Sequence, residues 1–417
     1  MTRKWLPWLV LAIGASPAMA AKSVSIQQFE QMLFADRGKS DDKVAERLSD
    51  LELTERVSPM RLAKWEKDFP GSRTREALMK LADQAAFLEP PQADVVRDPP
   101  PDNETQEKML ALALDYVRTT LGRLPNFYAT RETTHFEDIS SQPATYATGS
   151  GFGSGMRNIH VPGLAMGKSD PRPLHSTGKS SETVTYRDGS EVNQAQAGKR
   201  KEPDQPATGL TTTGEFGPIL GVVLGDAMRS QVTWARWEQG TSDPVAVFHY
   251  AVAQDVSRYG VEIPDGPKTA EFVDPAYHGE IAIDPATGSV LRLSVMADLA
   301  PPHEMMRTAI EVEYSPVEIG GRTCTCPVHG VAFSKIPVVS AKAEPPGTMP
   351  EVQTQLNDVA FTQYHQFGSE SRIVVGEGNA GAGSTPAAGE AAPAAVPSEP
   401  SPSAAGAPAT PPASQGP

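Results

Sequence analysis

The stretch RTAIEVEYSPVEIGGRTCTCPVHGVAFSK, residues 307–335, alternates apolar and polar side chains along much of its length. Successive side chains of a β-strand point to opposite faces, so this alternation is typical of strands with one buried face. The side chains that share the apolar face in its first half are Ile310, Val312 and Tyr314, and those on the opposite face include Glu311 and Glu313. The stretch therefore predicts two neighbouring strands of a sheet.

The same period of two recurs in segments between residues 125 and 375. These segments are residues 125–137, 182–194, 231–238, 244–252, 257–263, 277–284, 289–298, 351–362 and 364–375. Asp188-Gly189 is a hairpin signal, so residues 182–194 are expected to form two strands. Residues 215–228, EFGPILGVVLGDAM, predict one buried helix that crosses the sheet. Short strands joined by tight turns predict a large antiparallel sheet, curled or partly closed.

Helices are predicted before the sheet. Residues 21–101 carry apolar side chains at helical spacing, with helix-start signals at Ser25, Ser40 and Ser58-Pro59. Such short helices are unstable singly, so they predict a small helical bundle. The proline-rich segment EPPQADVVRDPPPD that follows is predicted to be a linker. Residues 103–121 form the clearest helix, and Asn103 with Gln106 is expected to cap it. The predicted fold class is α+β: an N-terminal helical bundle, then a large curled antiparallel sheet, half-barrel-like, with one buried helix.

Residues 1–20 have the three parts of a secretory signal peptide. Arg3 and Lys4 form a basic start, residues 5–15 are apolar, and Ala-Met-Ala at 18–20 is a cleavage signal. The apolar run is too short for a bilayer of about 30 Å, so we expect a soluble exported protein, periplasmic or secreted, without stable membrane insertion. The net charge of −14 becomes −16 when the two basic residues leave, which argues against nucleic-acid partners.

Two segments are too poor in large apolar side chains to join a core. Residues 138–181 contain alternating glycines, and residues 376–417 consist almost entirely of Ala, Pro, Gly, Ser and Glu. Neither composition buries enough apolar surface to offset the loss of chain entropy. We therefore expect a mobile insertion within a β domain of residues 102–375, and a disordered C-terminal tail.

The segment CTCPVHG, residues 324–330, holds both cysteines of the chain and a histidine three residues after the second. Strand alternation places Cys324 and Cys326 on one face and His329 on the other, and no second pair of ligands has zinc-site spacing. A buried strand is the favoured interpretation, and a strained disulfide between the two cysteines stays open as an alternative. No metal, no cofactor and no catalytic residue is predicted, so an enzyme is not expected.

Aromatic side chains of neighbouring strands give a weaker signal for ligand binding. Trp234, Phe248 and Tyr250 lie in adjacent predicted strands. Phe216 and Leu220 lie on the apolar stripe of the predicted buried helix. These five side chains either line a groove for an apolar ligand or form the core of the sheet, and the core is the favoured alternative.

Three glycines recur at every fourth position of the same helix, at residues 217, 221 and 225. A ridge of glycines lets a helix lie close against strand backbone, so we expect this ridge to face the sheet. On that expectation Gly221→Leu overpacks the contact and destabilises the protein by about 1–3 kcal/mol.

The predicted order of elements resembles the half-barrel of the periplasmic carriers that sort outer-membrane lipoproteins. This resemblance rests on the helix that ends near Leu121, on LGRLPNFYATRETTHFE (residues 121–137) and on the hairpin IAIDPATGSVLRL (residues 281–293). Other phrases, among them GEFGPILGVVLGDA and VEIGGRTCTCPV, are similar to those of an uncharacterised family of exported acidobacterial proteins. The carrier resemblance implies an apolar concavity that holds acyl chains, and the second resemblance implies architecture and export only.

Two functions follow as expectations. The first is an exported, non-enzymatic cell-envelope protein that binds or carries an apolar or amphipathic, lipid-like ligand. The alternative is a structural or interaction protein with a filled sheet interior, which docks a partner such as an envelope protein through its helical region. An open apolar pocket between sheet and helix would favour the carrier, and a packed interior would favour the interaction protein.

Overall fold

The computed structural model describes residues 22–120, 123–138, 173–192, 215–241, 243–264, 270–299, 307–337 and 352–367. The predicted signal peptide, the predicted C-terminal tail and residues 139–172 of the predicted insertion lie outside the described residues. The described chain has a mixed α+β fold with a large antiparallel sheet, which confirms these two parts of the predicted fold class.

Four helices and two short strands make up the N-terminal helical region. They are β1 (Lys22–Val24), α1 (Ile26–Asp36), α2 (Asp41–Ser49), β2 (Leu51–Leu53), α3 (Pro59–Asp68) and α4 (Ser72–Gln84). The start signals are confirmed, because Ser25 and Gln28 form a capping box on α1, Ser40 precedes α2, and Pro59 is the first residue of α3. The strands β1 and β2, which pair in parallel, were not predicted.

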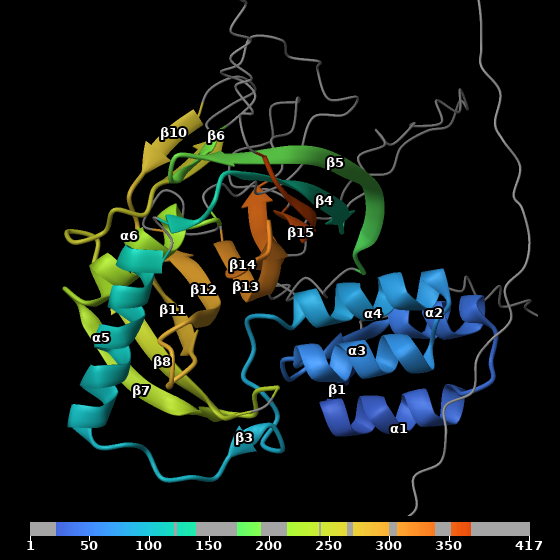
Figure 1. The fold of residues 1–417 in the computed structure, drawn as a ribbon. Coiled ribbons are helices and arrows are strands. Elements are labelled where there is room, and N and C mark those ends of the chain that lie inside the picture. Colours follow the sequence, from blue (N-terminus) through green and yellow to red (C-terminus); the bar gives the residue numbers. More distant parts are fainter. Residues whose placement is uncertain are drawn as a thin grey trace, which may run out of the picture. The chain divides into compact units, whose positions relative to one another are not determined.

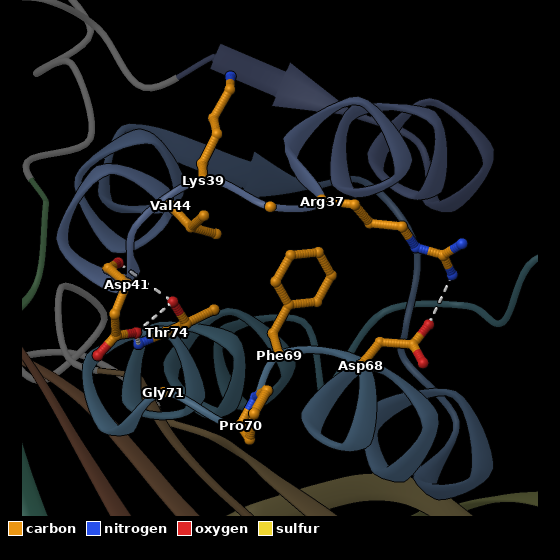
Figure 2. A pocket seen from close by; sticks show the side chains of 10 residues that line it. Arg37, Lys39, Asp41, Val44, Asp68, Phe69, Pro70, Gly71 and Thr74 are labelled. Carbon is orange, nitrogen blue, oxygen red and sulfur yellow. Dashed lines mark hydrogen bonds and ion pairs between the residues drawn. The ribbon is translucent and has the colours of Figure 1, made fainter.

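The helices α1–α4 lie beside one another (Figure 1) and share a hydrophobic core of their own. In that core the rings of Phe29 and Trp65 pack edge to face, with centroids 5.0 Å apart. Asp41 at the start of α2 also ties α2 to α4. Its carboxylate accepts hydrogen bonds from the backbone N–H groups of Arg73 and Thr74, at 3.2 and 2.9 Å, and so caps α4 (Figure 2).

The helices predicted at residues 103–121 and 215–228 are present as α5 (Asn103–Thr120) and α6 (Pro218–Ala227), and both pack against the sheet. The cap of α5 lies one residue earlier than predicted. Asp102 accepts a hydrogen bond from the backbone N–H of Thr105 at 2.8 Å, so Asn103 is already the first helical residue. Aspartate and asparagine cap helices about equally well, and the sequence pattern alone does not separate them.

The large sheet has 11 strands in the order β3-β7-β8-β11-β12-β13-β14-β15-β4-β5-β6. All of its pairs are antiparallel, and β3 and β6 stand at the two edges of the described sheet, which is therefore open. Its strands are β3 (Val95–Val96), β4 (Phe127–Glu137), β5 (His175–Arg187), β6 (Ser190–Val192), β7 (Gln231–Glu238), β8 (Val245–Val252), β11 (Ala276–Ile283), β12 (Val290–Asp298), β13 (Arg307–Ile319), β14 (Arg322–Pro337) and β15 (Val352–Gln366).

Three strands differ from their predicted ranges. Residues 351–362 and 364–375 were predicted as two strands, but β15 continues to Gln366, because an irregularity after Thr362 lets its pairing with β4 resume. Only the last three residues of the strand predicted at residues 257–263 form a strand, β9 (Val261–Pro264). This strand pairs with β10 (Ala270–Val273) outside the large sheet.

The third difference concerns β5, which begins at His175 and so includes the last residues of the predicted insertion. Most of its side chains are exposed, which explains why apolar alternation gives no signal there. The strand is held by its backbone pairing with β4. The predicted hairpin after it is confirmed, with φ of 52° at Asp188 and 82° at Gly189, as a tight turn of this kind requires.

The two faces of the sheet have different partners. We call the inner face the one that packs against α5 and α6, which lie together beside the sheet in Figure 1. The outer face is the opposite one, against which the C-terminal end of α4 packs. The alternation predicted for residues 310–314 is confirmed, because Ile310, Val312 and Tyr314 belong to the inner-face core, whereas Glu313 joins a charged cluster on the outer face.

Candidate functional site

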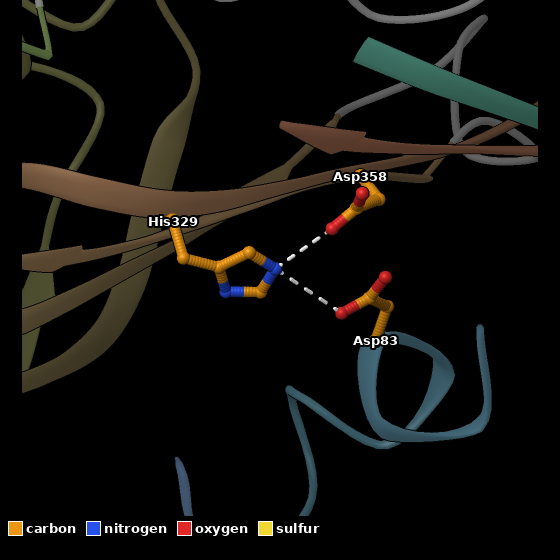
Figure 3. Close-up of side chains that lie close together, drawn as sticks. All are labelled: Asp83, His329 and Asp358. Atoms are coloured by element: carbon orange, nitrogen blue, oxygen red, sulfur yellow. Dashed lines mark hydrogen bonds and ion pairs between the residues drawn. The ribbon is translucent and has the colours of Figure 1, made fainter. Parts of the chain in front are cut away.

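The outer face carries a cluster of ionisable side chains around His329 of β14 (Figure 3). The Nε2 atom of His329 lies 2.9 Å from Oδ1 of Asp358, on β15, and 3.4 Å from Oδ1 of Asp83, in the last turn of α4. On the other side of the ring, Nδ1 lies 3.6 Å from Oε2 of Glu313, on β13. Three carboxylates therefore surround one imidazole at the contact between the helical region and the sheet.

Strand register explains how three of these residues meet. Glu313 pairs directly with His329 across β13 and β14, and Asp358 pairs with Val331, two residues further along β14. Side chains that are directly or diagonally opposed on one face lie within reach of each other. Sequence reasoning missed this cluster, although Glu313 and His329 lie on the polar faces of two strands that it predicted to be neighbours. The position of Asp83 on a distant helix had no sequence signal.

Burial and mutual contact shift the pKa values in this cluster. Burial raises the pKa of Asp83 to about 7, and the neighbouring carboxylate of Asp358 adds to the effect. Burial alone would lower the pKa of His329, but its bonds to Asp358, Asp83 and Glu313 outweigh burial and raise its pKa well above the ordinary value. The cluster is thus rich in carboxylates and holds positive charge strongly.

A second group of charges continues across the outer face and centres on Arg292 of β12. Its guanidinium lies 3.1 Å from Glu238, 3.1 Å from Glu280 and 3.6 Å from Glu311. Burial alone would raise the pKa of Glu238, but the positive charges of Arg292 and Arg56 outweigh burial and hold it well below its ordinary range. Burial raises the pKa of Glu311 to about 7.

The helical region contributes directly to this charged network. Arg56, in the loop before α3, donates to Glu238 at 2.7 Å, and both side chains are nearly buried. Arg236 on β7 forms two hydrogen bonds of 2.8 Å with Glu280 and also lies 3.1 Å from Glu89, which follows α4. The ion pairs therefore join the helical region to several strands of the sheet at once.

An apolar patch completes this contact. Ala86, at the end of the helical region, packs with Phe136, Val331 and Leu356 of the outer face. Burial of apolar surface supplies the non-directional part of the attachment, and the ion pairs fix its register. The helical region is thus docked on the sheet through both kinds of contact.

The two cysteines lie away from this cluster, as predicted. Cys326 is fully buried in the inner-face core and Cys324 packs against the same core, whereas His329 is on the outer face. Both thiols are free in the structure, so the alternative of a disulfide between them is wrong. Burial raises the pKa of Cys326 to about 12, which makes its thiol a poor nucleophile and metal ligand.

The five side chains predicted to bind a ligand are brought together on the inner face. Phe216, Leu220, Phe248 and Tyr250 are each at most 2% exposed, and Trp234 is partly buried against the same core. Trp234 packs edge to face on Phe248, with ring centroids 5.3 Å apart. Tyr250 donates its hydroxyl hydrogen to the backbone oxygen of Ser294 at 2.6 Å. These side chains pack together between the sheet and the helices.

Helix α6 is held over the inner face by a polar anchor at each end. Before its first turn, Glu215 is buried and pairs with Arg131 at 2.9 Å. In its last turn, Asp226 is 0% exposed and accepts hydrogen bonds from Arg258 at 2.6 Å and from the hydroxyl of Tyr277 at 2.9 Å. Between these anchors the helix carries no charged side chain.

The predicted glycine ridge of α6 does not face the sheet, so that expectation is wrong. Gly221 is exposed, and a Cβ atom built on it meets no atom within 4 Å. The apolar stripe of the helix, which includes Leu220, Val223 and Leu224, is what contacts the inner face. The expected overpacking by Gly221→Leu therefore has no structural basis.

Gly221→Ala is instead expected to raise the free energy of unfolding by about 0.5–1 kcal/mol, because alanine has a higher helix propensity than glycine at an exposed position inside a helix. The measurement is urea unfolding followed by circular dichroism. Gly225→Ala is the matched control in the same helix, since its added Cβ would lie 2.6 Å from the guanidinium of Arg258, which binds Asp226. A destabilised Gly221→Ala variant would contradict the observed orientation of the helix.

A cavity of about 320 Å³ lies where the ends of the helices α1–α4 meet (Figure 2). Its lining combines the charged side chains of Arg37, Lys39 and Asp68 with the apolar side chains of Val44 and Phe69. Arg37 and Asp68 already pair at 2.8 Å across its rim. The cavity thus offers mixed polar and apolar surface without a concentrated charge.

No helix within the described residues is both long and apolar enough to cross a membrane. No family model matches the chain, and comparisons with curated proteins and with solved structures found no match either.

Proposed function

We propose that this chain is an exported, non-enzymatic interaction protein of the cell envelope, in which the sheet is a rigid platform and the helical region docks a partner protein. The observation that carries the proposal is the packed inner face. The side chains expected to line a ligand groove are buried against one another and against α6. The signal peptide predicted from residues 1–20 supports export.

The attachment of the helical region supports the same proposal. This region has its own core, and buried ion pairs such as Arg56–Glu238 fix it on the outer face. A preformed and rigid surface loses little conformational entropy when it binds. The region also exposes the large apolar side chains of Phe34 on α1, at 70%, and Met60 on α3, at 55%.

The second candidate is the carrier of a lipid-like ligand, and helix α6 is the observation that favours it. The helix is apolar between anchors at its two ends, Glu215 and Asp226, so it has the form of a plug whose displacement would uncover the aromatic inner face. The resemblance to half-barrel lipoprotein carriers supports the same idea. In that case the open sheet would act as a half-barrel.

A fluorescent fatty-acid probe separates the two candidates. For the interaction protein we expect no saturable binding by the wild type at micromolar probe concentrations, because the inner-face side chains are buried against one another and against α6. Asp226→Asn weakens one anchor of α6 and is the informative variant for the carrier. Saturable wild-type binding that this variant alters would overturn the interaction proposal in favour of the carrier.

Site-specific photo-crosslinking tests the docking surface itself. A photoreactive phenylalanine analogue is placed at Phe34 or at Met60, in cells that make the protein naturally. Phe272 of β10, which is 72% exposed and lies outside the helical region, is the matched control position. We expect one discrete adduct from the helical region and none from the control. Adducts of equal yield at all three positions would contradict docking through this region.

A further inference from the structure

We propose that His329, Asp83 and Asp358 form a binding site for one divalent transition-metal ion, with Zn²⁺ as the representative of its class. One ligand atom from each of the three residues lies within 4.8 Å of the other two. In tetrahedral zinc sites the bonds to nitrogen and oxygen are about 2.0–2.2 Å, so neighbouring ligand atoms are about 3.3–3.6 Å apart. The distance from Nε2 to Oδ1 of Asp83, 3.4 Å, has this spacing. The distance from Nε2 to Oδ1 of Asp358, 2.9 Å, is that of a hydrogen bond, which a bound ion would replace and lengthen.

A second observation, an unpaired carboxylate oxygen of Asp83, also points to an ion at this place. The side chain of Asp83 is 1% exposed, and its Oδ2 atom has no hydrogen-bond partner among the described residues. A buried carboxylate oxygen without a partner is costly, so its persistence calls for an explanation. Figure 3 shows both carboxylates facing the Nε2 edge of the imidazole ring. A metal ion bound by both oxygens of Asp83 would satisfy Oδ2 as well.

The surroundings of His329 also match a metal ligand. A histidine that binds metal through one ring nitrogen usually donates the other N–H group to a carboxylate, which fixes the ring and its tautomer. Glu313 stands in that position, 3.6 Å from Nδ1. Asp83 and Asp358 would then bind the ion directly, and Glu313 would orient the imidazole.

A second group of possible ligands on the outer face differs from the His329 cluster in its exposure and in its charged neighbours. Glu89, His249 and Glu280 are also close enough to share an ion, but the side chains of Glu89 and His249 are exposed. Both oxygens of Glu280 are already paired with guanidinium groups, from Arg236 at 2.8 Å and from Arg292 at 3.1 Å. Its negative charge is satisfied by protein cations, whereas the His329 cluster contains no arginine.

The donor set indicates the class of ion. An imidazole nitrogen favours zinc, iron, nickel or copper over magnesium and calcium, and carboxylate oxygens complete a borderline donor set that suits zinc. Cys324 and Cys326 take no part, because they lie on the inner face. The proposal departs from the expectation of no metal, which rested on those cysteines. Since Asp83 lies on α4, a bound ion would fasten the helical region to the sheet.

Isothermal titration with ZnCl₂ tests the proposal on the full mature chain after removal of metal by a chelator. We expect saturable binding of one ion per chain and a higher melting temperature with zinc. Glu313→Gln is expected to weaken binding about 10–100-fold, as loss of an orienting partner does, and Asp83→Asn to weaken it more. His249→Gln, in the second group, is the matched control and should leave zinc affinity unchanged.

Cobalt provides a readout that does not depend on stability. The Co²⁺ complex of the wild type should show visible absorption from nitrogen and oxygen ligands, without the thiolate charge-transfer band that cysteine would produce. Circular dichroism of the metal-free Asp83→Asn and His329→Gln variants establishes which of them are folded. The zinc affinity of each folded variant is then compared with that of the wild type. The absence of saturable zinc binding in the wild type, or full affinity in a folded Asp83→Asn variant, would overturn the proposal.

Discussion

Arg292→Met is expected to lower the free energy of unfolding by about 3–5 kcal/mol, because it leaves buried carboxylates without their cation. The guanidinium of Arg292 is shared by Glu238, Glu280 and Glu311, and its side chain is only 9% exposed. Methionine fills a similar volume, so the loss reports on charge more than on packing. Urea unfolding followed by tryptophan fluorescence measures it.

Arg73→Met is the matched control for this prediction. Arg73 also pairs with a carboxylate, Asp42, at 2.8 Å, but the two side chains are 71% and 70% exposed. Exposed ion pairs contribute about 0–1 kcal/mol, so this variant should be close to wild type in stability. Equal losses from the two substitutions would mean that the outer-face network contributes no more than a surface pair.

The faces of the sheet could be predicted from the sequence because alternation is a local property. Ile310 and Val312 lie on the inner face, and Glu313 lies on the opposite face, as their spacing requires. The pattern could not show what covers each face. Polar side chains at every second position are usually solvated, and here they are covered because the helical region brings Arg56 and Asp83 against them. Such contacts join residues far apart in the chain and leave no local pattern.

Helix α6 shows a second limit of periodicity. Its glycines and its large apolar side chains both recur at helical spacing, so the sequence allows either side to face the sheet. Burial decides between them. Full burial of a Leu, Val or Phe side chain contributes about 1.5–3 kcal/mol, and glycine has no side chain to bury. The helix therefore turns Leu220 and Val223 to the sheet and leaves Gly221 exposed.

Phe216→Ala is expected to lower the free energy of unfolding by about 3–5 kcal/mol, as truncation of a fully buried phenylalanine does. Phe216 is 1% exposed and lies immediately before α6. Its ring packs edge to face on Phe361 and Phe127, with centroids 5.2 and 5.4 Å apart, and the rings of Tyr186 and Tyr364 are both at 6.3 Å. Calorimetry or urea unfolding measures the loss.

Phe272→Ala is the control, since that ring is 72% exposed and its removal should leave stability nearly unchanged. The buried substitution also tests whether the inner face is filled. An apolar cavity left by a large side chain can bind a small apolar molecule such as benzene. If the interior is packed, benzene should raise the melting temperature of Phe216→Ala and leave that of the wild type unchanged. If both gain equally, the wild type already contains apolar space, and the carrier function would replace the interaction function proposed above.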